Sequence, residues 1–472
     1  MRTLVWFRGK DLRVADHAPL ADAARRGEVL CLFVLDPFFF APARARRLPH
    51  RMQVLLESLE ALRGNLAHLG ARLLLAEGRS VDVVPRLARA WKVDRVVAQR
   101  WCEPFARERD RRVAAALGVP FELFEGETLT PPGTVRSGAG TPFQVFTPFA
   151  RALRATVPIA EPLRAPRRLL PPPVDIPHDD APLPTLASLG IARNERLPGG
   201  GEKPARARLR DFLATNAARY PDERNRLDLD STSRLSVDLH FGTLSPRSVW
   251  SAAREALEDA HPAAWQSWSN ELLWREFAHH VLWEEPELLD RPHRRAFEAF
   301  PWEDDAAGFA AWQSGRTGYP VVDAASRQLL GEGYVHNRAR MIAASFVTKD
   351  LRVDWRRGYA HYLEFLVDGD WAQNAAGWQW TAGCGFDAAP YFRIFNPVEQ
   401  GKRFDPHGAY VRRWVPELAQ LPARWIHEPW EAPPGVLAAA GVVLGGTYPR
   451  PILDHAARRD DYLAAATALK QR

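Results

Sequence analysis

The sequence contains only three cysteines, Cys31, Cys102 and Cys384, among 472 residues. They form no C-x-x-C motif and no paired framework, so the sequence predicts neither a disulfide scaffold nor a structural zinc site. Long apolar runs are also missing, because no stretch approaches the ~18 uncharged residues that a membrane span needs. Arg2 and Arg8 bring charge into the N-terminus too early for a signal peptide. These absences favour a soluble protein of the cytoplasm.

The chain also lacks a large net charge, which is +6 at pH 7. The surplus of basic residues lies in residues 1–205, whereas residues 206–472 carry a slight excess of acidic residues. Nucleic acid is an anionic partner, and its binding to the second part of the chain would therefore require a local basic patch.

Two nucleotide-binding fingerprints are missing. No G-x-G-x-x-G follows the first predicted strand and no G-x-x-x-x-G-K-[ST] occurs, which argues against dinucleotide-dependent dehydrogenases and P-loop kinases. Asp368 and Asp370 are close in sequence, but no further acid or histidine follows at the spacing of a calcium loop or a zinc site. The sequence thus predicts no metal site.

Tryptophan, by contrast, is abundant and unevenly distributed. Fourteen of the 17 tryptophans lie from residue 250 onward. A large aromatic core explains most of them, because an indole buries much apolar area. The same enrichment also suits a flat aromatic ligand or redox chemistry, and both interpretations stay open at this point.

The first 128 residues alternate short apolar runs with segments of helical spacing, as in Arg51–Leu69, Val81–Trp91 and Ala106–Leu117. This alternation predicts an α/β domain with a doubly wound parallel sheet and right-handed crossovers. The strands are expected at Thr3–Phe7, Val29–Leu35, Arg72–Leu75, Val93–Ala98 and Phe121–Phe124.

The segment 129–205 is predicted to be an interdomain linker. Pro158 to Pro184 contain nine prolines, and such a stretch can form neither a helix nor a central strand. After it, apolar residues recur at intervals of three and four, and β-branched runs are scarce. Residues 206–472 are therefore predicted to form a large all-α domain.

Two segments of the second part could bind an anion or a flat ligand. Thr232–Ser236 offers three hydroxyls at a predicted helix start, which suits a phosphate, although ordinary helix caps would also explain them. In the later segment Trp268–Phe277, Glu271, Trp274 and Arg275 could point into one cleft, or Glu271 and Arg275 could form a simple i,i+4 ion pair.

Two later segments carry further polar side chains. In Tyr334–Met341, two arginines and Asn337 would suit phosphates, whereas His336 is better explained as a structural histidine. In Asp368–Trp380, Asp370 is well placed as a helix N-cap, and Asn374 and Trp378 share one helix face at i,i+4.

Taken together, these motifs resemble the photolyase and cryptochrome flavoprotein family over essentially the whole chain, and the bacterial class I photolyases for cyclobutane pyrimidine dimers in particular. The matching segments occur in the family's order: Val5–Arg8 with Asp11–Arg13, Thr232–Ser236, Trp268–Phe277, His336–Met341, Gly377–Trp380 and Asp387–Pro397.

The resemblance implies that the helical domain binds FAD. The matching cofactor residues are Tyr220, Thr232, Ser233, Arg234, Leu235, Ser236, Trp268, Arg275, Arg340, Asp368, Gly369, Asp370 and Asn374. It further implies that Asn374 lies beside the reactive nitrogen of the flavin and that Arg340 and Asp368 form an ion pair near it.

The resemblance also implies light-driven DNA repair, in which reduced FAD passes an electron to a flipped-out pyrimidine dimer. The matching DNA contacts are Arg224, Glu271, Trp274, Asn337, Arg338, Met341 and Trp380. Three tryptophans, Trp378, Trp355 and Trp302, match the family's electron-transfer chain from the flavin towards the surface. These three, with Glu271 and Asn374, are the expected catalytic residues.

The first domain matches the family's antenna domain, which commonly binds a second chromophore. Folate-binding relatives tend to carry Asn-Glu where this chain has Phe105-Ala106, so a deazaflavin, a flavin or an empty pocket is favoured over folate. A cryptochrome photoreceptor without repair activity is the alternative function. No long signalling tail follows Tyr462–Lys470, which favours repair, and the expected partner is dimer-containing DNA bound by a monomer without an obligate protein partner.

Overall fold

The computed structural model describes residues 1–170, 176, 180–388, 390 and 392–470. Pro171–Pro173 of the predicted linker, and Ala389 and Tyr391 of the last motif, lie outside the described residues. Among the described residues, no helix is both long and apolar enough to cross a membrane.

The chain divides into two structural units, and each is taken by itself below. Unit 1 comprises Met1–Pro221 and Thr232–Pro286, and unit 2 comprises Asp222–Ser231 and Glu287–Arg472. The helical stretch up to Pro286 thus groups with the sheet, while the predicted domain boundaries after residues 128 and 205 stay a prediction.

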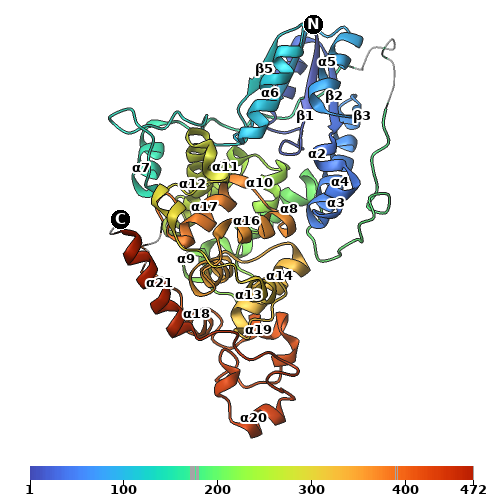
Figure 1. The fold of residues 1–472 in the computed structure, drawn as a ribbon. Coiled ribbons are helices and arrows are strands. Elements are labelled where there is room, and N and C mark those ends of the chain that lie inside the picture. Colours follow the sequence, from blue (N-terminus) through green and yellow to red (C-terminus); the bar gives the residue numbers. More distant parts are fainter. Residues whose placement is uncertain (171–175, 177–179, 389, 391, 471–472) are drawn as a thin grey trace. The chain divides into compact units, whose positions relative to one another are not determined.

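Unit 1 contains one parallel sheet of five strands in the order β3-β2-β1-β4-β5 (Figure 1). The sequence order reverses between β1 and β4, so these two strands flank the topological switch point at which open α/β sheets bind ligands. The predicted parallel doubly wound sheet is confirmed, with strand bounds that differ by at most two residues and coincide for Phe121–Phe124. The strands are β1 Arg2–Phe7, β2 Glu28–Leu35, β3 Leu73–Glu77, β4 Arg95–Gln99 and β5 Phe121–Phe124.

Helices cover both faces of this sheet, which explains why the central strands are buried after their first residue and apolar from Leu4 to Phe7 and from Val29 to Leu35. On one face, Leu4 and Trp6 of β1 pack with Val84 of α5 and Val113 of α6 in one buried cluster. The helices of this part are α1 Ala18–Arg26, α2 Pro37–Phe40, α3 Pro42–Arg46, α4 Pro49–His68, α5 Ser80–Ala90 and α6 Pro104–Ala116.

The rest of unit 1 is helical, and the predicted linker contains a helix, α7. No helix lies between Pro158 and Gly201 in the described part of the chain, as the prolines predict. The remaining elements are α7 Phe146–Thr156, α8 Glu202–Thr215, the 3-10 helix η1 Ala217–Arg219, α9 Tyr220–Glu223 at the passage to unit 2, α10 Ser236–Phe241, α11 Pro246–Leu257 and α12 Pro262–Glu284.

Unit 2 is all-helical, as predicted for this part of the chain. Its helices are α13 Ala306–Gln313, α14 Pro320–Glu332, α15 Asn337–Ser345, α16 Trp355–Phe365, α17 Trp371–Ala382, α18 Pro397–Phe404, α19 Ala409–Trp414, α20 Pro434–Ala439 and α21 His455–Lys470. Shorter segments are the 3-10 helices η2 Pro286–Leu289, η3 Arg295–Ala299, η5 Pro416–Leu418 and η6 Pro429–Glu431, and the π-helix η4 Phe346–Asp350.

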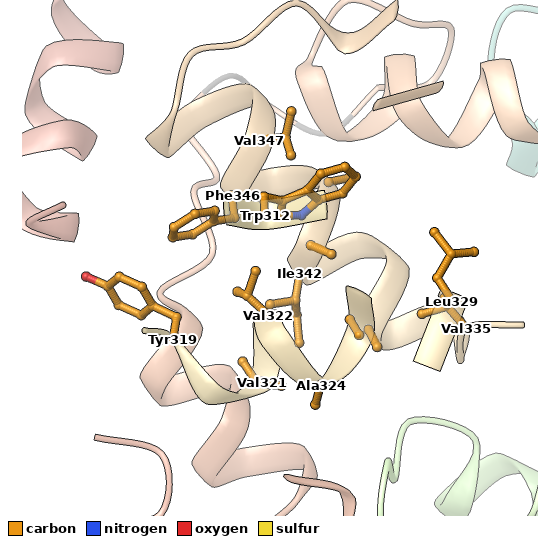
Figure 2. Packing of buried hydrophobic residues seen from close by; sticks show 14 of the residues in the cluster. Trp312, Tyr319, Val321, Val322, Ala324, Leu329, Val335, Ile342, Phe346 and Val347 are labelled. Atoms are coloured by element: carbon orange, nitrogen blue, oxygen red, sulfur yellow. The ribbon is translucent and has the colours of Figure 1, made fainter. Parts of the chain in front are cut away.

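One hydrophobic core holds unit 2 together. Figure 2 shows Val321 and Val322 of α14 beside Ile342 of α15, with Trp312 and Phe346 in the same cluster. Many of the tryptophans after residue 250 therefore lie in or against this core, as expected if they form a large aromatic core.

His361 of α16 lies in this aromatic environment and carries a pH dependence of stability. Its ring centroid is 5.4 Å from that of Trp312, and Gln313 Nε2 lies 3.1 Å from His361 Nδ1. Burial lowers the pKa of His361 to about 4. Because this value lies below that of an unfolded histidine, about 6.5, the neutral ring stabilises the fold above pH 6.5, and this contribution is lost as the pH falls towards 4.

We therefore expect the His361→Gln variant to lose less stability than the parent protein between pH 7 and pH 5. The difference should amount to about 2 kcal/mol in the free energy of unfolding, measured by urea denaturation at both pH values. A His68→Gln exchange at an exposed position is the control and should keep the parent's pH dependence. Identical pH dependence in the His361 variant would contradict the assignment.

Candidate FAD and DNA site

In unit 1, the loop Thr232–Ser236 has the backbone of an anion-binding nest. Arg234 has a left-handed φ of 50°, and Leu235 follows with φ −77° and ψ −2°. Successive residues of opposite handedness turn their N–H groups to the same side, where an anion is favoured. The N-cap of α10 is Leu235, whose side chain accepts no hydrogen bond. An ordinary Ser/Thr N-cap, the alternative explanation, is therefore not what this helix has.

Helix α12 places three of the predicted residues on neighbouring turns. Trp268 and Arg275 are both buried, and Glu271 is half-buried between them. The ring of Trp268 packs 5.7 Å from that of Phe212, on which Tyr220 also packs at 6.1 Å. The structure thus brings Tyr220 and Trp268 to one aromatic neighbour.

Arg275 fits an anionic ligand. Its Nη1 donates to the carbonyl oxygen of Glu127 at 2.6 Å, while its buried Nε has no hydrogen-bond partner among the described residues. A buried guanidinium donor without a partner is costly, and a phosphate or ribose oxygen would satisfy it. The donor set of the loop and of Arg275 therefore suits the phosphates of a dinucleotide such as FAD.

In unit 2, the predicted ion pair between Arg340 and Asp368 is confirmed. Arg340 Nη2 lies 2.8 Å from Asp368 Oδ2, and Arg340 Nε donates to the carbonyl of Val335 at 2.7 Å. The Asp368 carboxylate is almost fully buried, so its charge needs this partner. The pair joins α15 to the turn in front of α17.

Asp370 and Asn374 lie at the start of α17. Asp370 is the N-cap, as predicted, and accepts the backbone N–H of Gln373 at 2.9 Å. The side chain of Asn374 donates to the carbonyl of Tyr359 at 3.0 Å, which fixes its amide plane. Gly369, between the two aspartates, is buried as well.

Four arginines form what we call the arginine cluster: Arg224, Arg338, Arg393 and Arg403. Burial, together with the positive charges of Arg393, Arg224 and Arg403, lowers the pKa of Arg338 to about 10. Arg338 also donates to Asn225 Oδ1 at 2.7 Å, so its guanidinium is held in place. The cluster is a local basic patch in a part of the chain that is slightly acidic overall.

The other predicted DNA contacts are distributed over α12, α15 and α17. Trp274 of α12 is half-buried, Asn337 of α15 is exposed and lies 3.8 Å (Nδ2) from the Sδ of Met341, and Trp380 of α17 is half-buried. His336 caps α15 by accepting the backbone N–H of Arg338 at 3.1 Å, in line with a structural role.

The three tryptophans of the predicted electron-transfer chain differ in exposure. Trp378 and Trp355 are buried, whereas Trp302 is half-buried at the edge of the same core. Gly358 of α16 lies directly under the ring of Trp378, and a Cβ there would overlap the indole. Trp355 lies one turn before Gly358 on α16, and both Trp355 and Trp378 belong to the same buried cluster. The order from buried to partly exposed agrees with a row of indoles that leads outward.

Sequence reasoning assigned no role to Arg393 and Arg403. Arg393 belongs to the matched segment Asp387–Pro397, but its neighbours in the arginine cluster are far apart in sequence. Charge alone could not have found the cluster, because the surrounding region is slightly acidic overall.

Two family models match this chain. Residues 3–167 match the DNA photolyase model, and residues 268–468 match the model of the FAD binding domain of DNA photolyase. A deoxyribodipyrimidine photo-lyase from Thermus thermophilus is 43% identical over 417 residues, which cover 88% of this chain and 92% of that protein.

Solved structures agree with this assignment. The crystal structure of a bacterial class III photolyase from Agrobacterium tumefaciens superposes with a TM-score of 0.92 at 37% identity, covering 100% of this chain and 98% of that one. The cryptochrome of Synechocystis sp. PCC6803 superposes with a TM-score of 0.90 at 30% identity, covering 98% and 99%. The resemblance to class I proteins in particular stays a prediction. The chain belongs to the DNA photolyase family.

Proposed function

We propose that this protein is a carbon–carbon lyase that uses light to split cyclobutane pyrimidine dimers in DNA. The observation that carries the proposal is the arginine cluster beside α15. Clustered arginines bind the DNA backbone and position it without reading the sequence. A photoreceptor that does not bind DNA has no need of such a surface.

FAD, when bound and fully reduced, supplies the light-driven electron that opens the cyclobutane ring. The loop Thr232–Ser236 and Arg275 would hold its phosphates, and Asp368 and Asp370 would accept hydrogen bonds from its ribose or flavin donors. Asn374 would place a neutral amide beside the flavin, which suits the reduced form without adding charge. The protein thus contributes position and electrostatics, while the cofactor contributes the reactivity.

The dimer reaches the cofactor by leaving the duplex, as bases treated by photolyases do. Trp274 and Trp380 offer flat apolar surfaces for the extruded bases, and Glu271 can accept a hydrogen bond from a pyrimidine edge. Arg224 and Arg338 would neutralise phosphates on either side of the lesion.

A second chromophore would bind at the carboxyl edge of the sheet, at the switch point between β1 and β4. Two atoms of the buried Arg8, Nε and Nη2, and the Nε1 of Trp101 have no hydrogen-bond partner among the described residues. Such donors suit an anionic group on a flat chromophore. Phe105, at the position of the folate-binding Asn-Glu pair, stacks on Phe38 at 5.5 Å instead, which favours a flavin or deazaflavin.

The proposal is tested by illuminating the reduced holoprotein with an oligonucleotide that contains one thymine dimer. We expect intact thymines to form in light and none in darkness. The alternative function is that of a cryptochrome-type photoreceptor. The observation in its support is the likeness to the Synechocystis cryptochrome. This alternative predicts flavin photochemistry without dimer loss, and that outcome would contradict repair. We further expect the protein to elute as a monomer in gel filtration. We also expect it to act in the cytoplasm.

Trp274→Ala should weaken binding of dimer-containing DNA by roughly tenfold or more, because base stacking on an aromatic side chain is worth about 1–3 kcal/mol per base. Affinity for undamaged DNA should change little. Trp283→Ala is the matched control, since Trp283 lies on the same helix, is also half-buried and packs against Arg107. Fluorescence anisotropy with both DNAs measures the effect. Equal losses for damaged and undamaged DNA would refute the role of Trp274.

A further inference from the structure

Helix α7 is fastened along the part of α12 that carries the predicted lesion contacts. Phe149 of α7 packs on Phe277 of α12 with ring centroids 4.9 Å apart. Near the other end of α7, Arg154 Nη2 donates to Ser269 Oγ at 2.9 Å and to Asn270 Oδ1 at 3.0 Å. Both helices belong to unit 1, so α7 is held against the turns of α12 from Ser269 to Phe277.

The first residue of α7 stacks on Trp274. The ring centroids of Phe146 and Trp274 are 3.8 Å apart, and the ring planes differ by only 9°. Phe146 is 8% exposed, whereas Trp274 is half-buried. One face of the indole is therefore covered by a buried phenyl ring, and a base has to approach Trp274 from its other face or its edge.

We propose that Phe146 is a positioning residue for lesion recognition, which fixes the plane of the Trp274 indole so that its other face receives a pyrimidine of the dimer. The inference rests on the proposed function, because it takes Trp274 to be a lesion contact. It also assigns a role in substrate recognition to the segment between the sheet and the helical part, which the sequence suggests to be a linker.

The physical reason is preorganisation. An indole on a half-exposed helix face can rotate about its side-chain bonds, and a base that stacks on it must first immobilise it. Because Phe146 already orders the Trp274 indole in the folded protein, the entropic cost of ordering it is not part of the free energy of binding. Ordering one interface side chain before binding raises the affinity of the complex by about three- to tenfold.

The proposal is tested in the full-length holoprotein with Phe146→Leu, which removes the stacked ring but keeps an apolar side chain. We expect affinity for a dimer-containing oligonucleotide to fall about three- to tenfold relative to the same oligonucleotide without the lesion. FAD content and the rate of flavin photoreduction should stay unchanged. Phe146→Tyr, which keeps the ring, should restore most of the discrimination.

Two further variants distinguish the possible failures. Phe149→Leu loosens the packing of α7 on Phe277 without removing the ring that stacks on Trp274, so it should keep the discrimination. Added to Trp274→Ala, the Phe146→Leu change should have no further effect, since coupled residues are not additive. If Trp274→Ala alone leaves lesion binding intact, the proposed contact of Trp274 fails. If Trp274→Ala weakens lesion binding but Phe146→Leu does not, the positioning role of Phe146 is refuted. It is also refuted if Phe149→Leu weakens lesion binding as much as Phe146→Leu does.

Discussion

Exchange of Trp378 for phenylalanine should leave FAD bound and lower the rate of light-driven reduction of oxidised flavin by orders of magnitude. Phenylalanine is far harder to oxidise than tryptophan, so the first step of the row Trp378, Trp355 and Trp302 would be lost. The smaller ring also leaves a void above Gly358 in a buried site. We therefore expect an additional loss of about 1–2 kcal/mol in the free energy of unfolding.

Transient absorption after a blue flash, with an external reductant, measures the rate of flavin reduction. Trp312→Phe is the matched control, because its ring lies 6.0 Å from that of Trp378 in the same core but is not part of the row. The control should reduce its flavin at nearly the parental rate. An unchanged rate in the Trp378 variant, or an equal loss in both variants, would reject the row as the route of the electron.

Asp368→Ala should be among the most destabilising single changes in unit 2. It removes the partner of Arg340, whose side chain is three-quarters buried, and leaves that positive charge without compensation. Removal of one partner from a buried ion pair costs about 3–5 kcal/mol, and the partial exposure of Arg340 reduces the expected loss to about 2–3 kcal/mol. FAD retention should fall as well, because the turn from Asp368 to Asp370 loses its link to α15.

Urea denaturation and the ratio of flavin to protein absorbance measure both effects. Glu287→Ala is the control, because it breaks the exposed pair with Arg295 and should cost no more than about 0.5 kcal/mol. Asp368→Asn keeps the size of the side chain but not its charge, and should fall between the parent and the alanine variant. A loss of stability in Asp368→Ala no larger than that of the control would show that the pair contributes little.

The fold was predictable from the sequence because its signals are local. Each β-strand is a short apolar run, and each run lies within two residues of the observed strand, as for Val93–Ala98 and Arg95–Gln99. The N-cap role of Asp370 was equally accessible, since a cap depends on residues that are neighbours in sequence.

Features that depend on contacts between distant residues were not predictable. The arginine cluster joins residues 224, 338, 393 and 403, and only the fold brings them together. Helix α7 was predictable in part: Phe146, Phe149, Ala150 and Leu153 have helical spacing and are all buried. Because a proline-rich stretch follows it, the whole segment was predicted to be a linker. The stacking of Phe146 on Trp274 involves a helix more than a hundred residues away in sequence.

The close approach of α16 to Trp378 limits which residues can replace Gly358 in engineered variants. Exchange of helical glycines for alanine is a common route to thermostable variants, since alanine favours the helix. At Gly358 the added methyl group would meet the indole itself, so the gain in helix propensity would be outweighed by overpacking. Libraries that aim at hardier enzymes for repair in sunlight should therefore leave this position untouched.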